Sequence, residues 1–163
     1  MVEHLILSVD AMGGDEAPDM VIEGINLLAE RLPNVRFLLF GDEPQLTPLL
    51  DRFSHAKRAC EVQHTSQIIK SDDKPAIALR GGRESSMRLA INAVSNGEAA
   101  GIVSAGNTGA LMAMAKFVLK TLPGIDRPAI ASYLPTENGD SIMLDLGANI
   151  DCSSDNLVQF AVM

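Results

Sequence analysis

The chain has 163 residues, 47% of them hydrophobic, and a mean hydropathy of +0.14. This size and composition predict a soluble globular protein, and we expect residues 1–163 to belong to a single domain. No apolar run approaches the ~18 residues that a membrane-spanning helix needs, and the N-terminus lacks the pattern of a signal peptide, so we expect a cytoplasmic location. The net charge of −8 at pH 7 disfavours nucleic-acid binding, because the phosphates of the nucleic acid are repelled.

Basic residues are concentrated in the middle of this acidic chain. Eight of the 13 lysines and arginines lie between Arg52 and Arg88, against four acidic residues, which gives the segment a local excess of +4. Such a segment either steers an acidic partner or a phosphorylated ligand, or forms an ordinary solvated face.

The metal-binding residue types are sparse. Cys60 and Cys152 lie far apart without metal-ligand spacing, and the three histidines are scattered along the chain. We therefore expect no metal site and no cofactor.

The first part of the chain alternates strand-like and helix-like segments. The apolar run 5–9 predicts a buried strand that opens into a glycine turn, and a helix with a 3.6-residue period follows from Pro18 until Pro33. A strand over 35–40, a short helix that begins at Pro44 and a weaker strand over 60–64 complete a β-α-β-α-β order.

The middle of the chain contains a loop, a helix and another strand–helix pair. Residues 65–74 have no clear period and predict an irregular loop. Ser85 and Ser86 provide the start of a helix that Gly97 ends. A strand over 99–103 and a helix over 111–120 come next.

The pattern of the C-terminal part differs from the strand–helix alternation before it. Two strand candidates, 129–134 and 141–146, are joined by a segment with Asn138-Gly139, a hairpin signal that favours an antiparallel pair. Ser153 begins a further helix, but the chain ends at Met163 without a stop signal, so we expect a C-terminal truncation.

Strands and helices alternate over most of the chain. This alternation predicts a three-layer α/β/α fold with a mostly parallel sheet.

Three turns that combine glycine with short polar side chains follow predicted strands, at 10–15, 104–110 and 145–151. Because the carboxyl ends of parallel strands meet at one edge of a sheet, we expect these turns to share a crevice. The turn 104–110 is typical of a phosphate cradle, with glycines that allow close approach and a helix N-terminus behind them. It matches neither standard nucleotide fingerprint, and a turn chosen only for packing is the alternative.

Polar residues in the other two turns and before the helix at 86 allow several roles. Asp10, Asp145 and Asp151 can act as metal ligands, general bases or helix caps. Residues 80–88 contain three arginines and two serines at a predicted helix start, where they can hold an anion or form a salt-bridged surface.

Four blocks in the sequence resemble the signature motifs of the bacterial phosphate acyltransferase family, PlsX. They are Asp10–Pro18 (DAMGGDEAP), Val103–Met112 (VSAGNTGALM), Arg127–Ala129 (RPA) and Leu144–Cys152 (LDLGANIDC). The resemblance implies the α/β/α fold of phosphotransacetylases and the isocitrate dehydrogenase-like group. It also implies that family chains continue beyond Met163.

The implied activity converts a long-chain acyl group on acyl carrier protein, with inorganic phosphate, into acyl phosphate for phospholipid synthesis. A homodimer and peripheral membrane association are implied for the longer protein. The side chains assigned to the reaction itself are Ser104, Asn107 and Thr108. The residues assigned to phosphate or substrate binding are Asp10, Gly13, Gly14, Asp15, Arg83, Ser85, Ser86, Arg88, Gly106, Gly109, Asp145 and Asn149. The alternatives are a short-chain phosphotransacetylase and an inactive fragment that only binds an anion or the carrier.

Overall fold

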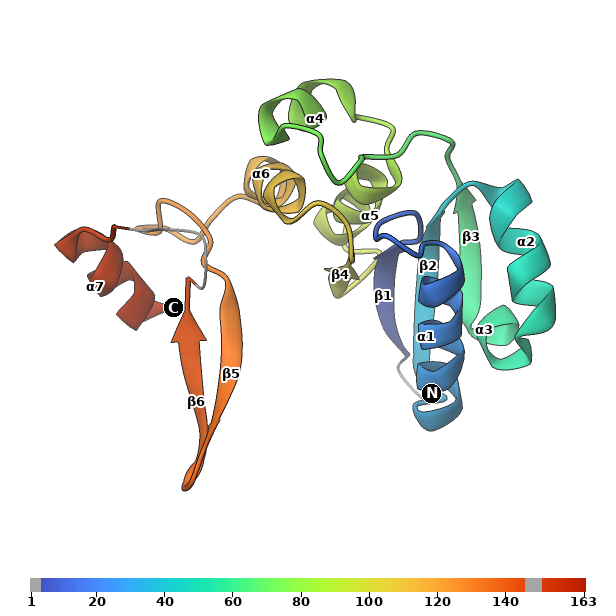
Figure 1. Ribbon diagram of the computed structural model, residues 1–163, viewed down its shortest axis with the longest axis horizontal. Helices are drawn as coiled ribbons and strands as arrows, with labels where there is room; N and C mark the ends of the chain where they lie inside the picture. Colours follow the sequence, from blue (N-terminus) through green and yellow to red (C-terminus); the bar gives the residue numbers. More distant parts are fainter. Residues whose placement is uncertain (1–3, 146–150) are drawn as a thin grey trace. The chain divides into compact units, whose positions relative to one another are not determined.

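The computed structural model describes residues 4–145 and 151–163 (Figure 1). The chain divides into two compact units, Met1–Leu119 and Lys120–Met163, and each is described by itself.

A four-stranded parallel sheet forms the centre of the first unit (Figure 1). Its strands are β1 (Leu5–Asp10), β2 (Val35–Gly41), β3 (Cys60–His64) and β4 (Gly101–Val103), in the order β3-β2-β1-β4. Val9 of β1 pairs with Leu39 of β2 on one side and Val103 of β4 on the other. The predicted parallel sheet is therefore confirmed, and the ends of β1 and β4 lie side by side.

One face of this sheet is covered by α1 (Asp19–Arg31), α2 (Glu43–Arg52) and α3 (Ser54–Ala59). Val9 and Leu39 pack against Ile22 and Ile25 of α1 and Leu46 of α2 in the main core. The alternation of side chains along a strand makes Phe40 point the opposite way from Leu39. Phe40 packs against Ala90 and Ala93 of α5 (Ser86–Ser95) on the other face, which gives the predicted three layers.

The first unit also contains α4 (Pro75–Gly81) and α6 (Thr108–Leu119). Helix α6 packs against α5, and α4 packs against α6, with Ala78, Ile91 and Met114 among the buried side chains of this group. Neither α3 nor α4 was predicted from the sequence. Their buried residues are all alanines, Ala78 in α4 and Ala56 and Ala59 in α3, so neither short helix carries a strong apolar stripe.

The second unit contains an antiparallel hairpin and a helix. β5 (Ala131–Thr136) pairs with β6 (Gly139–Leu144) in a sheet of its own, and Gly139 takes a positive φ of 117° at the turn, as the Asn138-Gly139 signal predicted. α7 (Ser154–Val162) begins with a capping box between Ser153 and Asn156. In either described range, no helix is long and apolar enough to cross a membrane.

Candidate functional site

The carboxylate of Asp10 joins three segments at the carboxyl edge of the sheet. Its Oδ1 accepts hydrogen bonds from the Ser86 hydroxyl (2.6 Å) and the Met12 amide (3.3 Å), and its Oδ2 accepts one from the Ser104 hydroxyl (2.8 Å). Only 2% of Asp10 is exposed. A buried carboxylate needs such donors, and the N-terminus of α5, where Ser86 lies, favours a negative charge nearby. Residues distant in sequence are thereby fixed around one charge.

Gly13 allows the first glycine turn to lie directly on the second. A Cβ at this position would be 2.4 Å from Asp10 Oδ2 and 3.0 Å from the amide nitrogen of Gly106. Any larger residue would therefore displace the carboxylate or the turn. The structure brings the turns at 10–15 and 104–110 together, as their places after parallel strands predicted.

A cleft of about 810 Å³ opens beside these two turns. Its lining comes from the first turn, from the loop before α4 and from the start of α6, and consists of Met12, Gly14, Asp15, Ile68, Ile69, Lys70, Ser71, Asp72, Ala105, Gly106, Asn107 and Thr108. Lys70 is the one cationic side chain in this lining. The 68–72 wall was not predicted from the sequence, because a loop without periodicity gives no signal of what it faces.

The N-terminus of α6 supplies hydrogen-bond donors at this cleft. Asn107 caps the helix: its Oδ1 accepts from the Ala110 amide (2.9 Å) and its carbonyl accepts from the Leu111 amide (2.9 Å). In the described part of the chain, the amides of Thr108 and Gly109 have no acceptor. Two unpaired amides at the positive end of a helix form a natural anion-binding position.

The side-chain nitrogen of Asn107 bonds to the chain itself. It donates to the carbonyls of Lys70 (3.2 Å), Ser71 (3.1 Å) and Asp73 (2.8 Å). The side-chain oxygen of Asn107 therefore caps α6, while its side-chain nitrogen bonds to the loop before α4. Thr108, by contrast, is exposed at the cleft.

Ser85 and Ser86 are buried and are not among the residues that line the cleft. They are 0% and 1% exposed, respectively. The Ser85 hydroxyl caps α5 by accepting from the Arg88 amide (3.2 Å) and donates to the Gly82 carbonyl (2.7 Å). The sequence analysis assigned both serines to phosphate or substrate binding, but as buried side chains they bond to the chain itself, Ser85 to Gly82 and Ser86 to Asp10.

Arg83 and Arg88 face a different cavity, of about 540 Å³, together with Arg80 and Phe117. The Arg88 guanidinium lies 5.5 Å from the centroid of the Phe117 ring, and its Nε donates to Asn92 Oδ1 (3.1 Å). A guanidinium above an aromatic ring is a stabilising arrangement. These arginines therefore form a basic surface apart from the cleft.

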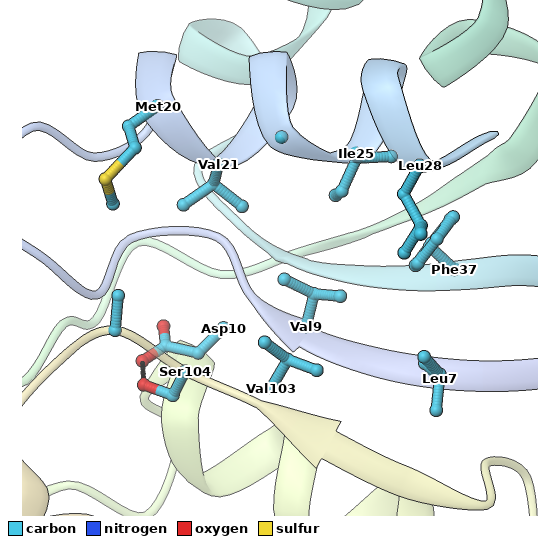
Figure 2. A pocket seen from close by; sticks show the side chains of 12 residues that line it. Leu7, Val9, Asp10, Met20, Val21, Ile25, Leu28, Phe37, Val103 and Ser104 are labelled. Atoms are coloured by element: carbon cyan, nitrogen blue, oxygen red, sulfur yellow. Dashed lines mark hydrogen bonds between the residues drawn. The ribbon is translucent and has the colours of Figure 1, made fainter. Parts of the chain in front are cut away.

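An apolar groove of about 250 Å³ lies between α1 and the strands β1 and β4 (Figure 2). Val21, Ile25 and Leu28 of α1 face Val9 and Val103 of the strands across it. Figure 2 shows the bond from Ser104 to Asp10 at one end of this groove. Ala105 lines both the groove and the cleft, so the two hollows adjoin.

Asp145, Asn149 and Gly109 are also among the predicted site residues. Asp145 is buried in the second unit, where its amide donates to the Ile130 carbonyl (2.6 Å), and Asn149 falls outside the described residues. Gly109 packs against α4, since a Cβ there would be 2.8 Å from Pro75 Cγ. Across residues 4–145 and 151–163, no three His, Cys, Asp or Glu side chains are grouped so that they could hold a metal ion.

Residues 5–163 match the profile of a family described as "Fatty acid synthesis protein". The chain belongs to this family. Members similar to it, all named phosphate acyltransferase, include those of Rhodospirillum centenum (strain ATCC 51521 / SW), 62% identical, and Paramagnetospirillum magneticum (strain ATCC 700264 / AMB-1), 61% identical, each over 163 residues. The alignments cover 100% of this chain but 46% of each relative, so the chain spans about half the length of the family members it matches.

Proposed function

We propose that this chain is part of an enzyme that transfers a fatty acyl group from a thioester on acyl carrier protein to inorganic phosphate. The product is an acyl phosphate, which serves phospholipid synthesis. The names of the relatives support the reaction class. The observation that carries the proposal is the position of Ala105, where a cleft with unpaired helix amides adjoins an apolar groove. A substrate pair of one anion and one acyl chain fits this combination.

Phosphate binds, in this proposal, at the amides of Thr108 and Gly109, with the Thr108 hydroxyl as a further donor. Helix N-termini bind phosphate through such amides and through the partial positive charge of the helix dipole. Lys70, which also lines the cleft, adds a full positive charge. Ser104 acts indirectly, because its proton is held by Asp10 and its oxygen accepts from the Gly106 amide (3.1 Å), which fixes the turn.

The reaction needs positioning more than a protein nucleophile. A phosphate oxygen attacks the thioester carbonyl carbon, the resulting oxyanion collapses, and the carbon–sulfur bond breaks. The carrier thiolate leaves and takes up the proton that the phosphate gives up, so atoms and charge balance without a cofactor. Orientation of the two reactants and donors aimed at the oxyanion account for catalysis of this kind.

The groove beside α1 holds the acyl chain, and the basic surface at Arg80, Arg83 and Arg88 receives the acidic carrier. The groove is lined almost entirely by apolar side chains, with Asp10 and Ser104 at the end nearest the cleft. The basic surface gives an overall acidic chain a local attraction for an acidic protein. Homodimerisation and membrane association of the longer protein remain predictions from the resemblance.

The amide of Thr108 allows a direct test, because Thr108 is the first residue of α6 and proline is well tolerated at that position. Thr108→Pro removes the amide and the hydroxyl, whereas Thr108→Ala removes only the hydroxyl. We expect the phosphate KM to rise about tenfold more in Thr108→Pro than in Thr108→Ala, as loss of one charge-assisted hydrogen bond implies. Ser154→Pro at the equivalent position of α7 is the control for proline itself.

Two outcomes would reverse this proposal. Equal phosphate KM values for the Thr108 variants would remove the α6 amides from phosphate binding. Preference for acetyl-CoA over long-chain acyl carrier protein would instead favour a short-chain phosphotransacetylase. Turnover and carrier binding measured on the same sample distinguish an enzyme from a fragment that only binds.

A further inference from the structure

We infer that Asn107 is a positioning residue that latches the 70–73 turn to the start of α6 and so sets the width of the phosphate cleft. The inference rests on the proposed function for what the cleft binds, but the latch itself rests on hydrogen bonds alone. It assigns to Asn107 a role other than contact with substrate.

The 70–73 turn is closed by its own hydrogen bonds. The Lys70 amide donates to the Asp73 carboxylate (2.9 Å), and the Asp73 amide donates to the Lys70 carbonyl (3.2 Å). These bonds shape the turn but do not join it to any other segment. Within the described ranges, the hydrogen bonds that join this turn to another element all come from the Asn107 side chain.

The turn forms one wall of the cleft. Residues 70–72 contribute to its lining, as do Gly14 and Asp15 of the first turn and the residues at the start of α6. Because Asn107 bonds to the 70–73 turn and also caps α6, it fixes this turn relative to the Thr108 and Gly109 amides. Release of the turn would move Lys70 away from those amides and weaken the binding of an anion between them.

The two functions of Asn107 can be separated by substitution. Serine is a good helix cap, so Asn107→Ser keeps an acceptor for the Ala110 amide but lacks the nitrogen that reaches the turn. Asn107→Ala removes the cap and the latch together. Both changes are neutral in charge, so neither adds a repulsive group beside a bound anion. Ser153→Ala, which removes the cap of α7, is a control for cap loss away from the cleft.

Amide hydrogen exchange tests the latch without reference to activity. In Asn107→Ser we expect exchange of the Lys70 and Asp73 amides to become about tenfold faster, while the first turn of α6 stays protected, because about tenfold corresponds to the loss of one to two net hydrogen bonds. In Asn107→Ala we expect both segments to exchange faster. Unchanged exchange at residues 70–73 in Asn107→Ser would overturn the latch.

Phosphate kinetics test the consequence for the cleft. We expect Asn107→Ser to raise the KM for phosphate severalfold while kcat stays within about twofold, because a residue that touches no reacting atom changes binding and leaves chemistry intact. A faster-exchanging turn with an unchanged phosphate KM would show that the wall does not shape the site, and would overturn the positioning role. If the enzyme that contains this chain forms no acyl phosphate, the proposed function fails, and the exchange experiment still decides the latch.

Discussion

The Ser104 hydroxyl donates a 2.8 Å hydrogen bond to the buried carboxylate of Asp10, which joins the ends of β4 and β1 across 94 positions of sequence. Ser86 completes the arrangement from the start of α5. The three donors on one buried carboxylate explain why two glycine turns are held in contact beside the cleft.

Substitution of Asp10 by asparagine should destabilise the fold. The amide retains one acceptor oxygen and directs its nitrogen at a hydroxyl that needs an acceptor, so we expect the free energy of unfolding to fall by about 1–3 kcal/mol. Urea unfolding followed by circular dichroism measures this change. Asp15→Asn, at an exposed position, should stay within about 0.5 kcal/mol of the unsubstituted protein. Similar losses for the two variants would contradict the role of Asp10.

Substitution by alanine at two glycines should change the stability of the protein in opposite directions. Gly13→Ala places a Cβ 2.4 Å from Asp10 Oδ2, and we expect such overpacking to lower the stability by about 1–3 kcal/mol. A Cβ at Gly24, inside α1, would have no neighbour within 4 Å, so Gly24→Ala should raise the stability by about 0.4–1 kcal/mol. Denaturation midpoints of the pair test both signs, and a stable Gly13→Ala variant would show that the turns can separate.

Gly24 also offers a test of the proposal that the apolar groove beside α1 binds the acyl chain. It lines the groove and has open space around it, so Gly24→Leu should fill part of the groove without displacing the backbone. We expect kcat/KM for long-chain acyl donors to fall relative to medium-chain donors. Gly81→Leu, at an exposed glycine outside the groove with equally open surroundings, is the matched control. A uniform loss for all chain lengths would place the acyl chain elsewhere.

The basic surface should contribute to carrier binding through its charge. Arg83→Gln removes one exposed charge, and we expect the KM for acyl carrier protein to rise about threefold to fivefold at low salt, since exposed ion pairs contribute up to ~1 kcal/mol. The effect should shrink at high salt because of screening. Arg31→Gln, an exposed arginine in α1, should leave this KM unchanged. If the two substitutions raised this KM equally, the carrier would respond to the net charge of the protein and would not bind at a defined surface.

The two cysteines should differ in reactivity. Burial raises the pKa of the Cys60 thiol from 9.0 to about 12, whereas Cys152 is exposed. Alkylation of the folded protein at mildly alkaline pH should therefore modify Cys152 and spare Cys60, as mass spectrometry of the labelled peptides would show. Equal labelling in the folded state would contradict the burial of Cys60.

The same shift predicts an alkaline loss of stability. The folded-state pKa lies above the unfolded value, so the stabilisation by the neutral thiol is complete below about pH 9 and is lost as the pH rises toward 12. Cys60→Ala should reduce this pH dependence. Unfolding free energies measured for both proteins across that range test it, and parallel profiles would show that other groups cause the loss.

The parallel sheet and most helices were predictable because their patterns are local. The apolar run before Asp10 and the 3.6-residue period after Pro18 each report burial directly, and the Asn138-Gly139 pair specifies its own turn. The short helices α3 and α4 were missed because alanines bury little area and leave no marked stripe.

The sequence by itself determined the fold class, the family resemblance and the two glycine turns of the sheet edge, because the alternation of strands and helices along the chain and the chemistry of each turn follow from short local patterns. Only the tertiary structure decided which polar side chains support the fold and which lie at a surface or cleft. Ser85 and Ser86 are buried supports, Arg83 and Arg88 face a separate surface, and Asn107 bonds to the 70–73 turn. Those roles depend on partners distant in sequence or on burial of the side chain, and a local sequence pattern predicts neither of them for a polar residue.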